Sequence, residues 1–283
     1  MKADFHVHSK ASDGDFTLPD LIKRAKENNL THMALTDHNI YNLVEIDKSN
    51  LDLEGICVIP SVEFDVCRNI DAGTKMHILG LNIDINNKKL NKYFKKYHNR
   101  NLKIVWAFYK KLHKIYGLNV KPSSVDRSSK LSYWGIATKF AYKMIQQGLS
   151  QKSLYDVGDE IRVHLSKKKF DFHNEKQVFK LIKSAGGIPV LAHPCSLHLD
   201  DTKLEEKVKY LKSLGLKGIE VYHPKITKEQ SKFYNQLAQK YDLFTSGGSD
   251  FHRYGEREDV FATDKGKNKV TIFDALKDVK PLF

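Results

Sequence analysis

Short hydrophobic runs alternate with segments of helical periodicity over most of the chain. The runs are rich in β-branched residues, and most are followed by apolar positions three or four residues apart, which is typical of repeated βα units. Seven strands are predicted, at residues 3–7, 32–36, 57–63, 76–81, 188–192, 218–222 and 243–246. Helices are predicted at residues 19–28, 175–185, 204–214 and 228–241, with Pro19 in a first turn and Gly215 after a last turn. This pattern predicts an α/β fold.

The centre of the chain has a different pattern. Residues 88–116 place apolar and aromatic side chains at helical spacing among lysines, and residues 138–147 form a second predicted helix. Residues 122–132 are polar and are predicted to form a loop. The length of 283 residues allows one large α/β barrel or two ordinary domains. We therefore expect a first barrel part (1–84), a mainly helical insertion (85–165) and a second barrel part (166–283).

Positive charge is concentrated in the same central block. The whole chain has 47 Lys and Arg against 34 Asp and Glu, a formal net charge of +13. Residues 85–170 hold 20 Lys and Arg against 4 Asp and Glu, a net of +16, and the remainder holds 27 against 30, a net of −3. Such a block is either a solvated lysine-rich surface or a face that attracts phosphates, and charge alone does not decide between them.

Composition excludes several classes of protein. With 41% hydrophobic and 29% charged residues, the chain is not expected to be disordered, and no run approaches the roughly 18 apolar residues of a membrane span. The cysteines Cys57, Cys67 and Cys195 form no C-x-x-C pair, which argues against a disulfide framework or a thiolate zinc site. The first residues lack the apolar segment of a secretion signal, so we expect a cytoplasmic protein without a membrane partner.

Six of the seven predicted strands bring a histidine or a carboxylate to one end. Strand side chains alternate, so His6 and His8 are expected to point to the same side. In a barrel of parallel strands the carboxyl ends share one face, where the active site lies. We therefore expect nine side chains to converge there: His6, His8, Asp13, His38, Glu63, His77, His193, Asp250 and His252.

The chemistry of this set favours bound cations. Imidazole and carboxylate groups are common ligands of Zn, Mn and Fe, and a buried cluster of unpaired charges is costly without cations. Nine ligands fit two or three divalent ions about 3.5–4 Å apart, with Glu63 as a natural bridge. Asp4 and Asp37 are expected to orient ligand imidazoles from behind. Six other histidines stay unassigned, namely His32, His98, His113, His164, His173 and His198.

The ordered motifs resemble those of the PHP (polymerase and histidinol phosphatase) family. The resemblance rests on His6-Val7-His8, Ser12-Asp13-Gly14, Thr36-Asp37-His38, Glu63, His77, Ala192-His193-Pro194 and Gly248-Ser249-Asp250-Phe251-His252. It implies a distorted (β/α)7 TIM-like barrel with a trinuclear Zn, Mn or Fe site that hydrolyses phosphate esters. It also implies one ion on His6, His8, Glu63 and Asp250, a second on Glu63, His77 and His193, and a third on Asp13, His38 and His252.

The resemblance extends to one branch of the family. The segment 76–84 and the insertion after it are similar to the branch that contains nucleoside 3′,5′-bisphosphate phosphatases and a 5′→3′ exonuclease, which implies a nucleotide or oligonucleotide substrate. That branch carries two arginines in its insertion, whereas the corresponding run 136–142 has none. Lys10, Lys139 and Lys143 are candidate replacements as substrate contacts, although lysine lacks the bidentate fork of arginine.

We expect a metal-activated hydroxide as the nucleophile and none from the protein, since metal ions lower the pKa of bound water toward 7. The chain has no P-loop, dinucleotide-binding fingerprint or G-x-S-x-G motif. A histidinol-phosphate-type phosphatase, a metal-dependent amidase or deaminase, and a non-catalytic nucleic-acid-binding module remain open. A nucleic-acid-binding module would be expected to carry aromatic residues among basic ones. Tyr93, Tyr97, Trp106, Phe108 and Tyr109 lie among lysines, although their helical spacing favours core packing.

Overall fold

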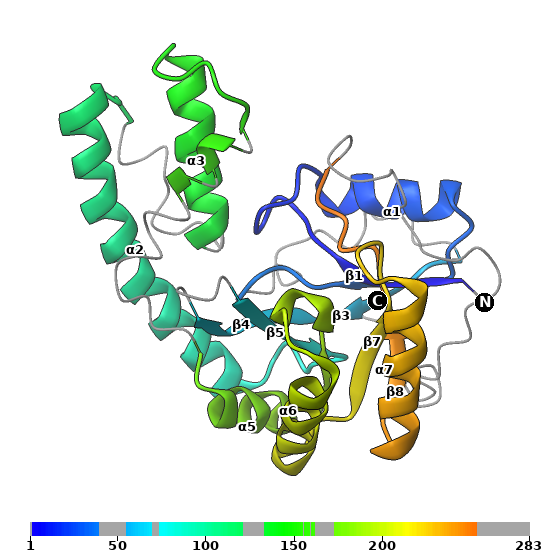
Figure 1. The fold of residues 1–283 in the computed structure, drawn as a ribbon. Coiled ribbons are helices and arrows are strands. Elements are labelled where there is room, and N and C mark those ends of the chain that lie inside the picture. The colour runs from blue at the N-terminus through cyan, green and yellow to red at the C-terminus, as the bar shows by residue number, and fades with distance from the viewer. Residues whose placement is uncertain are drawn as a thin grey trace.

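The strands form two sheets (Figure 1). The computed structural model describes residues 2–39, 55–69, 74–120, 133–154, 156–158, 160–161 and 173–253, so the predicted loop 122–132 lies outside the described residues. In the first sheet, β1 (Ala3–Val7), β2 (His32–Leu35) and β3 (Cys57–Pro60) are parallel. The second sheet has the order β4 (Val62–Asn69), β5 (Thr74–Leu81), β6 (Ile188–Leu191), β7 (Gly218–Tyr222) and β8 (Phe244–Gly247).

Helices lie between the strands close to their predicted positions. They are α1 (Leu18–Glu27), α5 (Glu175–Ser184), α6 (Asp201–Leu214) and α7 (Lys228–Lys240), and a short 3₁₀ helix η4 (Pro194–Leu197) follows β6. Thr17 and Thr227 begin α1 and α7 with capping boxes, which satisfy the free N–H groups of the first turn. Gly215 ends α6 with φ 111°, a conformation that favours glycine. The predicted α/β class is confirmed.

One strand departs from the predicted parallel arrangement. β5 is antiparallel to both β4 and β6. The predicted strand 57–63 is divided at Ser61, because β3 pairs with β2 whereas β4 pairs with β5. Only four residues separate β4 from β5, which is too few for the crossover that parallel neighbours require. The prediction of parallel strands throughout was therefore wrong at β5.

The two sheets, into which the described strands pair, share an interior. Single parallel bridges join Val7 to Phe251 and His38 to Glu63. Strands of both sheets also contribute to one buried apolar cluster, which contains Phe5, Ala34, Ile59, Leu79, Leu81, Val190 and Ala192. The described strands thus form a mixed α/β fold in two hydrogen-bonded sheets, and a closed barrel is not shown.

Two helices of the central block lie side by side and project from the sheets (Figure 1). α2 (Lys88–Tyr116) has its predicted bounds, and α3 (Tyr133–Gln146) begins earlier than the predicted helix. Their apolar side chains form a cluster of their own that includes Tyr97 and Phe140, with Trp106 and Tyr109 packed against it. These aromatic residues of α2 serve core packing. Among the described helices, none combines the length and the apolar character that a membrane span requires.

His173 connects α2 to the sheets. Its Nε2 lies 2.6 Å from Asn39 Oδ1 and donates to it, so its Nδ1 accepts a hydrogen bond from the Tyr93 hydroxyl of α2. The ring also packs on Tyr97, with ring centroids 4.1 Å apart. Burial lowers the pKa of His173 to about 3, so the ring is neutral at pH 7.

A His173→Gln variant is expected to change how stability depends on pH. The folded pKa of His173 lies below the unfolded value, so this residue stabilises the fold fully above about pH 6.5 and loses that contribution as the pH falls. The wild-type protein should lose about 1.4 kcal/mol per pH unit relative to the variant below that value. Urea unfolding of both proteins at about pH 7, 6 and 5 measures this difference, and a constant difference would contradict the assignment.

Candidate metal centre

Four predicted ligand side chains meet near the ends of β1, β4 and β8. They form the first group, which consists of His6, His8, Glu63 and Asp250. Glu63 Oε2 lies 3.3 Å from His6 Nε2 and 3.2 Å from His8 Nε2. Asp250 Oδ1 lies 3.6 and 3.4 Å from the same two nitrogens. A Cβ at Gly248 would lie only 2.3 Å from the Cβ of His6, so glycine permits the close approach that carries Asp250 to this group.

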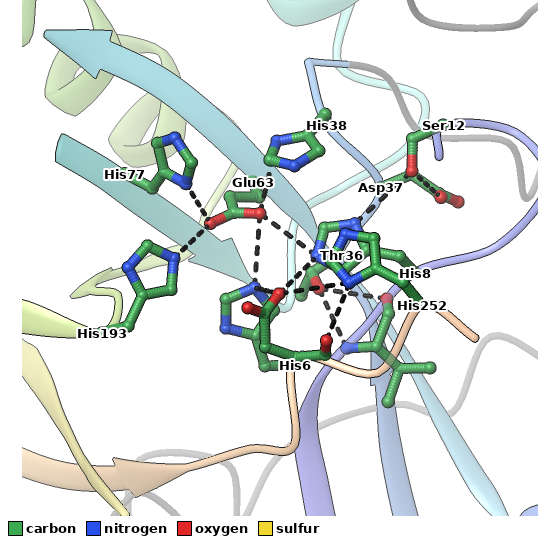
Figure 2. A network of polar contacts seen from close by, with 12 residues as sticks. His6, His8, Ser12, Thr36, Asp37, His38, Glu63, His77, His193 and His252 are labelled. Atoms are coloured by element: carbon green, nitrogen blue, oxygen red, sulfur yellow. Dashed lines mark hydrogen bonds and ion pairs between the residues drawn. The ribbon is translucent and has the colours of Figure 1, made fainter. Parts of the chain in front are cut away.

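The other carboxylate oxygen of Glu63 faces a second group. Glu63 Oε1 lies 2.7 Å from His77 Nδ1 and 3.1 Å from His193 Nε2, and Figure 2 shows both rings directed at it. His77 lies in the first half of β5, and the reversed direction of this strand brings that half to the ligand cluster. His193 follows β6 with φ 24°, a left-handed conformation that costs a non-glycine residue about 1–3 kcal/mol.

A third group forms around Asp13, in the loop after β1. Asp13 Oδ1 lies 3.2 Å from His252 Nε2 and 3.7 Å from His8 Nδ1, and Asp13 Oδ2 lies 3.9 Å from His38 Nε2. The rings of His8 and His252 stack with centroids 4.1 Å apart. The third group is therefore continuous with the first through His8.

The structure brings all nine predicted ligands into these three groups, in each of which the ligand atoms lie within 4.8 Å of one another. Glu63 belongs to the first and second groups, His8 belongs to the first and third, and His38 and His77 form a further group with Asp65. Apart from His8 in the third group, the membership is the same as the ligand sets that the sequence resemblance implies. The side chains therefore have the placement that a centre with several ions requires.

The buried carboxylates and unpartnered atoms of the cluster favour positive charge at its centre. Burial would raise the pKa of Glu63, but His77, His38 and His6 hold it well below its usual range. Burial opposes the charged form of His38, yet Glu63, Asp65 and Asp13 raise its pKa to about 10. Among the described residues, His6 Nε2, His8 Nε2 and Glu63 Oε2 are buried without a hydrogen-bond partner. Such atoms fit divalent cations, because a bound ion satisfies lone pairs that are otherwise costly to bury.

Two buried carboxylates hold His6 from behind. Asp4 Oδ1 accepts the N–H of His6 at 3.1 Å and that of Ser249 at 2.9 Å, so these contacts fix the main chain. Glu220 Oε1 lies 3.2 Å from His6 Nδ1 and is placed to orient the ring. Its other oxygen accepts the N–H of His193 at 2.6 Å. Sequence reasoning missed Glu220, although a single carboxylate inside the apolar strand 218–222 was a visible signal.

Asp37 supports His8 through a serine. It accepts hydrogen bonds from the N–H of Ser9 at 2.8 Å and from the hydroxyl of Ser12 at 2.6 Å. Ser12 Oγ lies 3.4 Å from His8 Nδ1. The described contacts therefore connect Asp37 to this imidazole through a hydroxyl group.

Three further residues at the cluster were missed by sequence reasoning. Asp65 Oδ1 lies 3.2 Å from His77 Nε2, and it was detectable because alternation in a strand places it on the same side as Glu63. His223 Nε2 and Lys225 Nζ lie 3.4 and 3.5 Å from Asp250 Oδ2. Both follow β7, the one predicted strand to which no ligand was assigned.

The three lysines predicted as substrate contacts lie in two regions. Lys10 is exposed in the loop after β1, next to the strand that carries His6 and His8. Lys139 and Lys143 lie on α3, where Lys139 is exposed and Lys143 Nζ donates to Gln146 Oε1 at 2.8 Å. Their contact with a substrate stays a prediction.

Comparison with known proteins places the chain in a family. The PHP domain model matches residues 4–242, so the chain belongs to the PHP family. A phosphoribosyl 1,2-cyclic phosphate 1,2-diphosphodiesterase of Eggerthella lenta is 25% identical over 258 residues, covering 89% of this chain and 94% of that protein. A 5′-3′ exoribonuclease of Haemophilus influenzae is 27% identical over 259 residues, covering 89% and 90%.

Two further similarities concern one relative and one solved structure. A 3′,5′-nucleoside bisphosphate phosphatase of Chromobacterium violaceum is 25% identical over 269 residues, covering 89% of this chain and 88% of that protein. A solved structure from Bifidobacterium adolescentis superposes with a TM-score of 0.74 at 21% identity, covering 99% of this chain and 97% of that one, which shows a shared fold. The chain is thus a metal-dependent phosphoester hydrolase of the PHP family.

Replacing Glu220 by Gln is expected to weaken metal binding without unfolding the protein. The amide retains the size of the side chain but loses the charge that strengthens the hydrogen bond to His6 Nδ1. Mn²⁺ affinity measured by calorimetry should fall about 10- to 100-fold, the range for residues that orient a ligand. Glu205→Gln removes a carboxylate that pairs with Lys240 outside the cluster and serves as the control. Equal Mn²⁺ affinity in both variants would refute this role of Glu220.

Proposed function

We propose that this chain hydrolyses phosphate esters of nucleotides or oligonucleotides with two or three divalent ions of manganese, zinc or iron. The observation that carries the proposal is the convergence of three imidazole–carboxylate groups around Glu63 (Figure 2). The first ion would be held by His6, His8, Glu63 and Asp250, the second by Glu63, His77 and His193, and the third by Asp13, His38 and His252.

Divalent ions in such a centre activate water as a nucleophile and neutralise phosphoryl oxygens. The residues of the chain set the geometry for this chemistry. Glu63 directs one oxygen at each of two groups, and Glu220 orients the ring of His6. Lys225 is half-exposed beside Asp250, where a flexible ammonium group is suited to contact a substrate phosphate.

Three hydroxyl and thiol groups near the centre are poorly suited as protein nucleophiles. Ser9 and Ser12 donate their hydroxyl hydrogens to the buried Asp37. Burial raises the pKa of the Cys195 thiol, which disfavours the reactive thiolate. These contacts support water as the attacking group.

The basic central block supports a substrate with several phosphates. It carries the excess positive charge of the chain, and α2 displays exposed lysines such as Lys95 and Lys96. Relatives named as an exoribonuclease and as a nucleoside bisphosphate phosphatase make nucleotide substrates the favoured class. A non-catalytic nucleic-acid-binding role is less favoured, because Tyr97, Trp106 and Tyr109 pack in a core and are not available for base stacking.

We also propose that the two sheets represent the distorted barrel implied by the sequence, with residues 85–165 as an insertion over it. The apolar cluster shared by both sheets supports one barrel interior. The separate apolar cluster of α2 and α3 supports treating the insertion as a unit.

Replacing His8 by Ala should lower metal loading and activity together. His8 is a proposed ligand of the first ion, so its loss removes one of the four side chains that would hold that ion. Metal analysis of protein reconstituted with Mn²⁺ should show fewer bound ions, and hydrolysis of adenosine 3′,5′-bisphosphate should fall more than about 100-fold. His198→Asn, which changes an exposed histidine, is the matched control. Undiminished hydrolysis by a metal-depleted His8→Ala protein would disprove the proposed chemistry.

The substrate class can be tested through salt dependence. Mn²⁺-loaded enzyme is assayed with adenosine 3′,5′-bisphosphate, a 5′-phosphorylated oligoribonucleotide, a cyclic phosphodiester and histidinol phosphate. If α2 contacts the phosphate backbone, the affinity for the oligoribonucleotide falls with salt, with a log–log slope of about −0.7 per phosphate contact. The double substitution Lys95→Glu and Lys96→Glu should reduce this slope, and Lys180→Glu with Lys183→Glu on α5 should not. Preference for histidinol phosphate with no salt effect would contradict the nucleotide assignment.

A further inference from the structure

Asp65 lies between imidazoles of two different ligand groups. It pairs directly with His77 across the β4–β5 hairpin, and its Oδ1 is 3.2 Å from His77 Nε2. The same oxygen is 3.1 Å from His38 Nδ1. Asp65 is buried, with 3% of its surface exposed. One carboxylate oxygen therefore contacts a ring of the second group and a ring of the third.

The opposite nitrogens of these rings face the ligand groups, and His38 Nδ1 itself also lies 3.3 Å from Glu63 Oε2. His77 Nδ1 lies 2.7 Å from Glu63 Oε1, and His38 Nε2 lies 3.9 Å from Asp13 Oδ2. A neutral imidazole offers one lone pair to a metal ion and one N–H to an acceptor. With those lone pairs turned to the ions, the remaining nitrogens are His77 Nε2 and His38 Nδ1, which lie 3.2 and 3.1 Å from Asp65 Oδ1.

Asp65 is itself held firmly. Asn39 Nδ2 donates to Asp65 Oδ2 at 2.7 Å, and the N–H of Asp65 donates to Asn39 Oδ1 at 3.0 Å. The N–H of His173 donates to the Asp65 carbonyl at 3.1 Å. Asn39 has φ 53°, so the backbone is bent to bring its amide opposite Asp65. These contacts leave the carboxylate little freedom to turn away from the two rings.

We propose that Asp65 is a positioning residue that accepts N–H bonds from both His38 and His77 and thereby couples the second and third ion sites. The inference rests on the proposed function, because it assigns the lone pairs of the two rings to metal ions. Loss of this one carboxylate should weaken two sites at once, whereas loss of a ligand in one group should weaken that group alone.

Calorimetric titration with Mn²⁺, together with metal analysis, tests this coupling. Asp65→Leu retains the approximate size of the side chain without an acceptor, and Asp65→Asn retains one acceptor oxygen. In the Leu variant the affinities of the second and third ions should fall together, by about 10- to 100-fold each, while the first ion binds as before. The Asn variant should recover part of the loss. Asp242→Asn, at a fully exposed carboxylate, is the control.

A spectroscopic measurement on the wild-type protein keeps the test independent of how the variants fold. Long-range ¹H–¹⁵N spectra of Zn²⁺-loaded protein report which imidazole nitrogen carries the proton. We expect His38 to carry it on Nδ1 and His77 on Nε2. The opposite tautomers, an additional ion bound through Asp65, or unchanged Mn²⁺ affinities in folded Asp65→Leu would each overturn the inference. A wild-type protein that binds no metal would instead refute the proposed function.

Discussion

The structure depends on one buried carboxylate that needs positive charge on both of its oxygens. Glu63 is fully buried, and the imidazoles of His6, His8, His77 and His193 lie within 3.3 Å of its oxygen atoms. A charge in this position is tolerated only when cations or cationic partners surround it. Divalent ions meet that need with directional bonds, and the same ions make phosphoester hydrolysis possible.

The strands and loops that place the ligands around Glu63 depart from regular βα geometry. The break between β3 and β4 places Glu63 at the junction of the two sheets, and the reversed β5 returns His77 to the same place. His193 adopts a left-handed conformation that few histidines adopt, and the N–H bond to Glu220 holds it there. Strained residues persist where the surrounding structure fixes them, which is common at functional sites.

The sequence predicts the ligand groups better than it predicts the sheets. Short spacings such as His6-Val7-His8 carry chemistry that local alternation makes visible, and the structure brings these side chains close together. Strand direction was not accessible, because β5 has the same periodicity whether it runs parallel or antiparallel. Glu220 differs, because a carboxylate inside an apolar strand is a visible signal of a buried partner, but the local pattern does not say that this partner is His6.

Anomalous X-ray diffraction from crystals of the protein grown with Mn²⁺ tests most directly whether Glu63 lies between bound ions. We expect separate anomalous peaks at the first and second ligand groups, with Glu63 between them, and a further peak beside Asp13, His38 and His252 when the centre is fully loaded. Crystals of fully reconstituted protein with no peak at Glu63, or with Mn²⁺ bound only elsewhere on the molecule, would contradict this expectation.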